Sequence, residues 1–286
     1  MEGSKLKNIV IVILVVLNLC LLLLSGGRRI QDVRSREQAR TDAVEVIRHG
    51  GVILDEQIVP ADMKLLPMMA ERDLKSEILQ ARALLGGDVT AQAKGGEVYR
   101  YANEVGWLQV HSTGQYSARM EPGLPVTEQE TPQAHALALM KLLDMECRVV
   151  VSEVAGGQGE VVLNQTLNGA DLLDCQVRVT YRDGCAVQIS GNRRLLGQAE
   201  TSGGVPITVS TALMRLFNGL NDMGDVYSAI TSINPVYVLS SEGADSMRLT
   251  PVWQVETDTG TYRLDTLTGT LTRTGDLARQ VAEEAE

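Results

Sequence analysis

Aromatic side chains are scarce in this sequence: the 286 residues include two Trp, seven Tyr and one Phe, and aromatics make up 3% of the chain. Positive charge is scarce as well, because 26 Lys and Arg face 36 Asp and Glu, for a net charge of −10. Proteins that bind single-stranded nucleic acids use aromatic stacking platforms, and phosphate-binding surfaces need clustered Lys and Arg. We therefore expect no nucleic-acid partner, and a core built mainly from aliphatic side chains.

Histidine is rare too, and the motifs of common enzyme classes are missing. His49, His111 and His135 fall in separate segments without a metal-ligand spacing such as HExxH, so each is predicted to be a surface residue. The Gly-Gln-Gly of residues 157–159 lacks the third glycine of a dinucleotide-binding fingerprint, and the chain has no GxSxG, Walker or CxxC sequence. We expect a binding protein rather than an enzyme, with no catalytic residue, no metal and no cofactor.

Four cysteines are present, and one of them, Cys20, falls in an apolar N-terminal run. In a predicted hairpin with its loop at residues 182–184, Cys175 and Cys185 lie about 17 Å apart along the strands, at about 3.4 Å per residue. A disulfide needs Cα atoms within about 7 Å, so these two cysteines cannot bridge each other. A bond from Cys147 to either one stays open, although three buried thiols are the preferred interpretation.

Two further patterns in the middle of the chain have a functional and a plain interpretation. Asp171 and Asp174 are near enough in sequence to be considered as paired catalytic carboxylates, but nothing in the sequence marks a partner or a pocket for them. A solvated loop is the preferred interpretation. Asn164-Gln165-Thr166 matches a glycosylation sequon, yet it falls in a predicted strand, and such matches arise often by chance.

The N-terminal part contains a long apolar run, IVIVILVVLNLCLLLL over residues 9–24. With its flanking residues the run reaches 20 residues, and a helix of that length spans about 30 Å, the thickness of a bilayer core. We predict a transmembrane helix over residues 9–27 that contacts the lipid bilayer. A signal peptide cut near the small residues 25–27 is the alternative, but the run exceeds the usual apolar core of about 7–15 residues.

Asn18 lies in the middle of this predicted span, where its amide can hydrogen-bond a neighbouring helix for about 0.6–2 kcal/mol. A tolerated polar residue without a partner is an equally good interpretation, so Asn18 is a candidate partner-binding residue. Residues 1–40 carry seven basic and three acidic side chains, which leaves a net charge of −14 for the remainder. Such an acidic body favours protein partners over anionic polymers. The basic residues on the two sides of the span leave its topology undecided.

Beyond the span, the apolar periodicity predicts helices and strands in alternation. Helices are predicted over residues 28–49, 71–85 and 131–145, with Thr131 as a cap and Pro132 in the first turn, and from the linker at 203–206 to about residue 221. Strands are predicted within residues 98–120 and at 148–154, 160–167, 174–182, 185–191, 236–240 and 247–256. A last hairpin turns at residues 258–260.

Two hairpins have a register that follows from their apolar faces. In the first, a three-residue loop with Gly114 left-handed places Val110 opposite Tyr116 and Leu108 opposite Ala118. In the second, the loop at 182–184 pairs the following residues: Tyr181 with Cys185, Val179 with Val187, Val177 with Ile189, and Cys175 with Gly191. Because a helix followed by an antiparallel meander recurs over 121–200 and 201–275, the fold class is α+β, with a transmembrane helix followed by two to three helix-plus-antiparallel-sheet subdomains.

Three segments resemble the YycH/YycI family of two-component-system regulatory proteins. The first is KLKNIVIVILVVLNLCLLL followed by a charged stretch and DAVEVIRHGGVILDEQIVP, and the second is the strand block LNQTLNGADLLDCQVRVTYRDGCAVQISGNRRL. The third, INPVYVLSSEGADSMRLTPVWQVETDTGTYRLDTLTGTL, is similar to the closing motif of YycI, which PepSY-like domains share. The resemblance covers most of the chain in order, loosely and without one diagnostic motif.

The resemblance implies a domain order and a topology. Residues 1–8 would be a cytoplasmic tail, 9–27 the transmembrane helix and 28–49 a juxtamembrane helix. The extracytoplasmic body would comprise the following parts: a first α+β segment over 50–120, a subdomain over 121–200, a PepSY-like subdomain over 201–275 and an acidic tail over 276–286. The protein would then be a single-pass protein of the cell membrane with its body outside.

The resemblance also implies a function. The protein would bind and restrain a sensor histidine kinase that controls cell-wall metabolism, together with a related YycH-type regulator in the membrane. The transmembrane helix would take part in that contact, with Asn18 as the candidate residue. Two alternatives stay open: a PepSY-like inhibitor or scaffold of an extracellular protease or wall enzyme, and an envelope enzyme of another kind.

Overall fold

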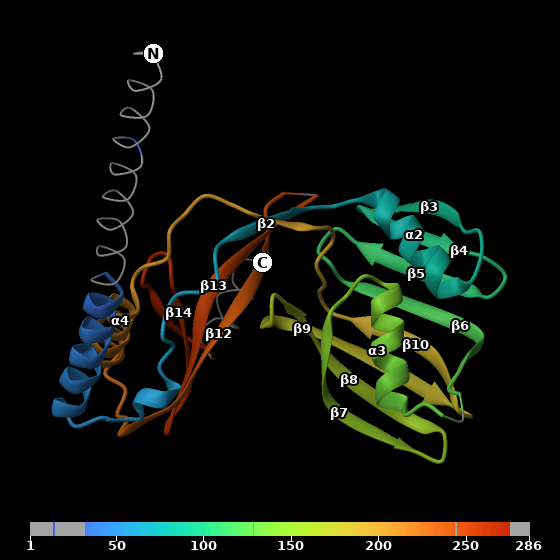
Figure 1. Cartoon of the computed structure of the whole chain (residues 1–286). Coiled ribbons are helices and arrows are strands. Elements are labelled where there is room, and N and C mark those ends of the chain that lie inside the picture. The colour runs from blue at the N-terminus through green and yellow to red at the C-terminus, as the bar shows by residue number, and fades with distance from the viewer. Residues whose placement is uncertain (1–13, 15–31, 128, 244, 275–286) are drawn as a thin grey trace, which may run out of the picture.

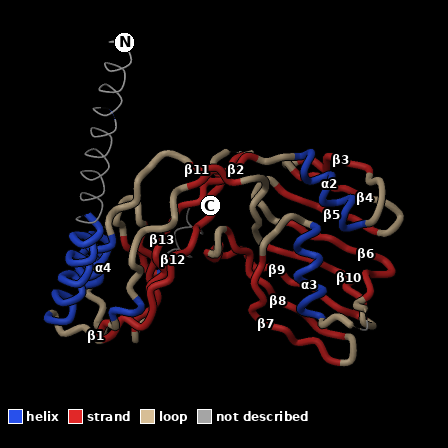
Figure 2. Tube along the Cα trace, in the orientation of Figure 1, coloured by secondary structure: helices blue, strands red, loops and turns tan. Residues whose placement is uncertain are grey.

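The computed structural model describes Leu14 and residues 32–127, 129–243 and 245–274. These residues form two lobes that lie side by side and join near the top of the view (Figure 1). The eight-stranded lobe contains the middle of the chain, and the terminal lobe combines segments that precede and follow it. Helices cover one side of the strands in each lobe (Figure 2).

The eight-stranded lobe consists of two units, each a helix followed by four strands. The first unit contains α2 (Leu74–Leu85), β3 (Thr90–Gly95), β4 (Val98–Ala102), β5 (Gly106–His111) and β6 (Tyr116–Pro125). The second contains α3 (Pro132–Leu142), β7 (Cys147–Ala155), β8 (Gln158–Leu167), β9 (Ala170–Arg182) and β10 (Cys185–Gly191). The two last strands, β6 and β10, pair antiparallel and fuse the units into one sheet of order β3-β4-β5-β6-β10-β9-β8-β7.

Local sequence explains where the two helices of this lobe begin and end. The Asp73 carboxylate accepts a hydrogen bond from the Lys75 backbone N–H at the start of α2, and left-handed Gly86 ends that helix. At the start of α3 the Thr131 hydroxyl accepts from the Ala134 N–H and Pro132 occupies the first turn, so the predicted start signal is confirmed.

The terminal lobe is built around the longest strands. Its elements are a helix over residues 32–49, β1 (Ile53–Leu54), a 3₁₀ turn η1 (Glu56–Ile58), β2 (Met68–Glu71), β11 (Ala199–Thr201), α4 (Val209–Asp222), β12 (Ala229–Ser241), β13 (Ser246–Thr257), β14 (Thr261–Asp265) and β15 (Leu271–Arg273). The predicted apolar stripe of α4 is confirmed, because Leu213, Leu216 and Leu220 are fully buried. They pack with Val44 and Ile47 of the first helix in a core separate from that of the eight-stranded lobe.

The expectation of two to three subdomains, each with an antiparallel sheet of its own, is wrong, because all fifteen described strands connect into a single sheet. The two lobes meet where Leu172 and Leu173 of β9 pair in parallel with Tyr237 and Val238 of β12. A second parallel pair joins β1 to β12, so the sheet is mixed rather than antiparallel. Alternation along a strand shows which face is apolar, but it does not show which strand pairs with which across units.

The transmembrane helix in the expected fold is also corrected. No helix in the described part of the chain is long and apolar enough to cross a membrane. The predicted span 9–27, with Asn18, lies outside the described residues apart from Leu14, and so do the predicted tails 1–8 and 276–286.

The first hairpin has the predicted register and the second does not. Val110 pairs with Tyr116 and Leu108 with Ala118, and Gly114 is left-handed at φ 85°. In the second hairpin Asp183 and Gly184 both take positive φ and make a two-residue turn, and the register shifts between Ala186 and Gln188. Ile189 therefore faces Val179 instead of Val177. The apolar face that was used to set the register is nevertheless buried, as Cys175, Val177, Val179 and Tyr181 show.

Candidate functional site

The three histidines lie apart from one another, and one of them is not on the surface. His135 of α3 is buried, which contradicts the prediction of a surface residue. Its Nδ1 lies 3.1 Å from the Tyr181 hydroxyl, which itself donates to the Pro132 carbonyl at 3.0 Å. Since the hydroxyl has one hydrogen, Nδ1–H is the donor to Tyr181. Burial lowers the pKa of His135, so the neutral imidazole is a packed core residue of this lobe.

The cysteines and the sequon are part of the sheet. Cys147, Cys175 and Cys185 are free thiols, with Cys175 buried and the other two partly exposed. Burial raises the pKa of Cys147 and of Cys175 to about 12, so both are poor nucleophiles. Asn164 is buried in β8, and its amide donates to the Leu172 carbonyl, so the sequon is a chance match inside the fold.

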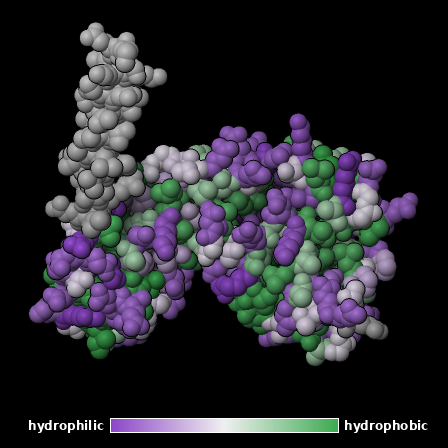
Figure 3. Space-filling view, in the orientation of Figure 1, coloured by the Kyte–Doolittle hydropathy of each residue, from purple (hydrophilic) through white to green (hydrophobic). Residues whose placement is uncertain are grey.

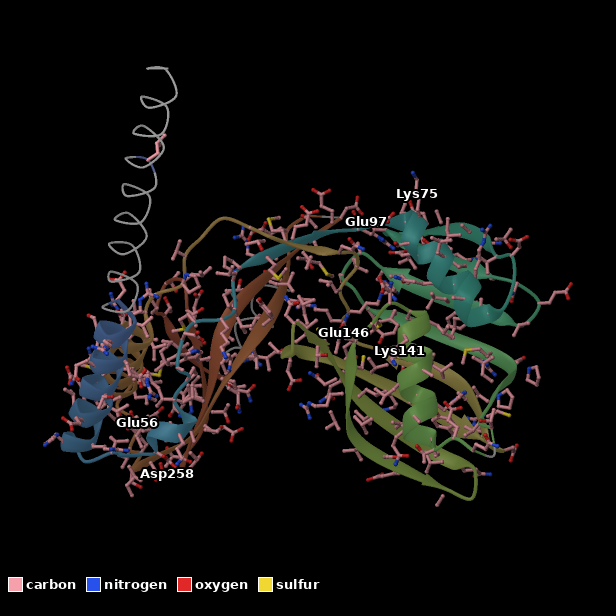
Figure 4. The ribbon with its side chains drawn as sticks, in the orientation of Figure 1. Glu56, Lys75, Glu97, Lys141, Glu146 and Asp258 are labelled. Atoms are coloured by element: carbon pink, nitrogen blue, oxygen red, sulfur yellow. The ribbon has the colours of Figure 1, made fainter. Side chains whose placement is uncertain are left out.

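A buried ion pair fixes the start of α2 against the sheet. Arg72 Nε donates to Glu77 Oε1 at 2.8 Å, and both side chains are 1% exposed or less. The Tyr101 hydroxyl donates to Glu77 Oε2 at 2.7 Å, and burial together with this bond raises the pKa of Tyr101. Arg72 also donates to the backbone carbonyls of Glu97 and Val110. Figure 4 labels Glu97 close to the start of α2.

A second buried arginine reaches the next turn of the same helix. Arg194, 1% exposed, donates from Nη2 to Gln80 Oε1 at 2.6 Å, and its guanidinium lies 5.5 Å from the centre of the Tyr116 ring. Arg72 and Arg194 therefore contact successive turns of α2. Ser76 and Gln80 of those turns also line an open groove.

This groove, which we call the acidic groove, has a volume of 650 Å³ and lies between α2 and the β2–β11 pair. Four carboxylates line it, and no Lys or Arg does. The carboxylates are contributed by Glu71 of β2, Asp73 at the cap of α2, Asp144 after α3, and Glu200 of β11. The remaining lining residues are small, polar or apolar: Met69, Ser76, Gln80, Leu195, Gly197, Gln198, Thr201 and Ser202.

The charge of the groove is not neutralised within the described chain. Glu71, Asp73, Asp144 and Glu200 take part in none of the ten ion pairs among the described residues. The Lys75 backbone N–H lowers the pKa of Asp73, so that carboxylate stays ionised. The Lys75 side chain is exposed and projects outward from the lobe (Figure 4). Clustered carboxylates of this kind attract a cationic ligand or segment.

One wall of the groove is the edge strand β11, which pairs with β2 alone among the described strands. The Ser202 N–H donates to the Pro67 carbonyl at 2.9 Å. Because hydrogen-bonded and non-bonded positions alternate in an antiparallel pair, Ala199 and Thr201 direct their backbone N–H and C=O away from β2. The Ser202 hydroxyl is buried without a hydrogen-bond partner in the described chain. This edge can accept an added strand.

Asp171 and Asp174 lie at a different place, and each has an arginine partner of its own. Asp171 forms an ion pair with Arg148 at 2.6 Å, and Asp174 forms one with Arg263 of the other lobe at 3.4 Å. Both aspartates lie on β9 and line a pocket between the lobes, so the predicted loop is wrong, although Asp174 is 72% exposed. Among the described residues no group of three or more His, Cys, Asp or Glu is arranged to hold a metal ion.

The acidic groove has no signature in the sequence. Its lining residues come from three separate stretches, 69–80, 144 and 195–202, and the groove exists only because β11 pairs with β2. The sequence carries one weak signal for it. Asp73, the N-cap of α2, directly follows Arg72, whose side chain is buried in an ion pair with Glu77 of the same helix.

Comparison with protein-family models finds no matching family, and comparison with curated proteins finds no match. Among solved structures the chain is similar to an uncharacterized protein from Eubacterium rectale, with 11% identity and a TM-score of 0.44, over 74% of this chain and 86% of that one. It is also similar to the Bacillus megaterium YpeB C-terminal domain, with 13% identity and a TM-score of 0.34, over 71% of this chain and 98% of that one.

None of these comparisons shows the YycI-specific identity. Both TM-scores lie below 0.5, so neither similarity supports an argument about what this chain does.

Proposed function

We propose that this protein is a regulatory binding protein of the cell envelope that docks on a sensor histidine kinase controlling cell-wall metabolism and restrains it, with a YycH-type regulator as a second partner. The family resemblance supports the identity of the partners. We also propose that binding takes place outside the cell, as the resemblance implies.

The observation that carries a binding function is the acidic groove beside the free edge of β11. Its unpaired carboxylates favour a basic partner segment, and the outward N–H and C=O groups of Ala199 and Thr201 favour an extended one. The segment would add to β11 as a strand and place its Lys or Arg side chains beside Glu71, Asp144 and Glu200. A regulator that prefers one signalling state of its partner shifts the partner toward that state.

Two changes test the groove separately for charge and for strand addition. Glu71→Gln with Glu200→Gln removes two carboxylates at nearly constant volume. Exposed ion pairs contribute about 0.2–1 kcal/mol each, so the affinity is expected to fall by about 2- to 30-fold. Thr201→Pro removes an N–H that faces away from β2, so it blocks strand addition while leaving the β11–β2 pairing intact.

The experiment is crosslinking and pull-down from native membranes with the full-length chain, followed by identification of the captured proteins. The wild type is expected to recover a histidine kinase, and both changes are expected to reduce that recovery. Glu153→Gln, an exposed carboxylate on β7 away from the groove, is the matched control and is expected to change nothing. Equal recovery with all variants would refute docking at the groove. Recovery of a protease instead of a kinase would favour the PepSY-like inhibitor.

A further inference from the structure

The pocket that contains Asp171 and Asp174, which we call the inter-lobe pocket, shares no lining residue with the acidic groove. Its volume is 420 Å³, within the range of about 300–1,000 Å³ typical of small-molecule sites. The eight-stranded lobe contributes Arg148, Asp171, Asp174 and Gln176, and the terminal lobe contributes Gln254 of β13 and Arg263 of β14. Figure 3 shows the hollow between the two lobes below their join.

The pocket exists because β9 changes partner at this point. Its register against β8 shifts between Asn164 and Thr166, where several β9 residues face a single residue of β8. Within that bulge Leu172 and Leu173 turn to pair with β12, and Asp174 takes a left-handed backbone at φ 61°. Bulges of this kind re-aim side chains and are frequent beside binding sites. Here the bulge aims Asp174 at the other lobe.

The charges of the pocket come in two opposite pairs. Arg148 binds Asp171 through two contacts, of 2.6 and 3.4 Å. Arg263 reaches Asp174 through a single contact of 3.4 Å, although its side chain is only 17% exposed. A guanidinium has five N–H donors, so Arg263 keeps donors for a further acceptor, and Asp174, 72% exposed, keeps acceptor sites for a further donor.

This arrangement selects among ligand classes. A simple anion would be attracted by the arginines and repelled by the aspartates. A simple cation would be attracted by the aspartates and repelled by the arginines. A zwitterion satisfies both pairs, and the amides of Gln176 and Gln254 match the donors and acceptors of a peptide unit. The described lining residues include no aromatic ring, the usual platform for a sugar face. The size of the pocket suits an amino acid or short peptide.

We propose that the inter-lobe pocket binds an amino acid or a short peptide with free termini, its carboxylate on Arg263 and its ammonium on Asp174. Because Arg263 and Asp174 belong to different lobes, the bound ligand contacts both lobes at once. It therefore extends the ion pair of Arg263 with Asp174 into a three-part contact and favours the lobe arrangement seen here.

The test is calorimetric titration of the full-length chain with the dipeptide Ala-Ala. N-acetyl-Ala-Ala, which lacks the ammonium, and Ala-Ala amide, which lacks the carboxylate, are the chemical controls. Saturable binding of Ala-Ala is expected, with each blocked peptide weaker by about 10- to 100-fold, the range for one hydrogen bond to a charged group. Absence of binding by Ala-Ala, or equal binding of the blocked peptides, would overturn the proposal.

Protein variants assign the two termini. Arg263→Gln is expected to weaken Ala-Ala by the same factor while leaving Ala-Ala amide unchanged. Asp174→Asn keeps a residue that tolerates the left-handed backbone, and it is expected to make Ala-Ala and N-acetyl-Ala-Ala bind equally. Arg178→Gln is the matched control, because Arg178 lies on β9 outside the pocket lining and pairs with Glu160 of β8 at 3.2 Å. A loss of Ala-Ala binding in Arg178→Gln as large as in Arg263→Gln would refute the assignment.

Discussion

The ion pair between Arg72 and Glu77 is predicted to be the polar contact on which the eight-stranded lobe depends most. Glu77 is fully buried and accepts from Arg72 at 2.8 and 3.2 Å and from Tyr101 at 2.7 Å. Glu77→Gln replaces one acceptor oxygen by an NH₂ group that faces donors, and it leaves the charge of Arg72 buried without a counter-charge. Removing one partner of a buried pair costs about 3–5 kcal/mol, so we expect a loss of that size.

The assay is urea unfolding followed by tryptophan fluorescence, with free energies extrapolated linearly to zero denaturant. Trp107 lies on β5 in the eight-stranded lobe and Trp253 in the core of the terminal lobe, so in a Trp253→Phe background the fluorescence reports the eight-stranded lobe alone. The control is Glu160→Gln, which breaks a surface pair and is expected to cost less than about 1 kcal/mol.

A double change separates lost pairing from lost packing. Arg72→Met with Glu77→Met removes both charges at similar volume and is expected to be more stable than Glu77→Gln, because no unpaired charge stays buried. A loss below about 1 kcal/mol in Glu77→Gln would refute the reasoning. A double variant less stable than that single variant would refute it as well.

Three further predictions follow from burial. Burial lowers the pKa of His135 in the folded state, so below about pH 6.5 the unfolded state binds more protons than the folded state. The free energy of unfolding of the wild type should therefore fall with acidification, and it should fall less steeply in His135→Gln. Urea midpoints at pH 7.5 and 5 measure the difference. Cys185 should react with iodoacetamide before Cys147 and Cys175, whose thiol pKa values near 12 disfavour the thiolate; mapping of labelled peptides by mass spectrometry checks the order. Gly114→Ala should lower the unfolding free energy by more than about 1 kcal/mol, because its Cβ would lie 2.6 Å from the Arg194 carbonyl oxygen at φ 85°; thermal unfolding tests this, and an unchanged Tm would contradict it.

Local pattern was sufficient for part of the fold. The cap at Thr131 depends on residues within one helical turn, and the first hairpin depends on a single glycine in a loop between two apolar faces. The predicted register of the second hairpin was wrong because Asp183 is left-handed, which the predicted three-residue loop did not require. Asp183 and Gly184 form a two-residue turn instead. A bulge then compensated, and the same side chains were buried in a different register.

The rest depends on contacts between distant segments. His135 was expected on the surface because it has no metal-ligand spacing and lies early in its helix, yet it is buried together with Ala136, Leu139 and Met140 of α3. The acidic groove brings together Glu71 and Glu200, which are 129 residues apart, and the cross-lobe contact joins Arg263 to Asp174, which are 89 residues apart. No pattern of neighbouring residues predicts contacts over such sequence separations, because they depend on which strands of distant segments pair.

The pairing of β6 with β10 has a consequence for synthesis of the chain. β6 ends at Pro125 and β10 ends at Gly191, so the ribosome adds a further 66 residues before the partner of β6 is complete. At a synthesis rate of about 5–20 residues per second, the edge of β6 that pairs with β10 lacks this partner for roughly 3–13 s after β6 itself has been synthesised. During this interval the backbone N–H and C=O groups along that edge of β6 lack their partner strand, so the edge can accept a strand from another nascent chain. The order of the strands in the sheet thus sets how long the growing chain is exposed to such pairing.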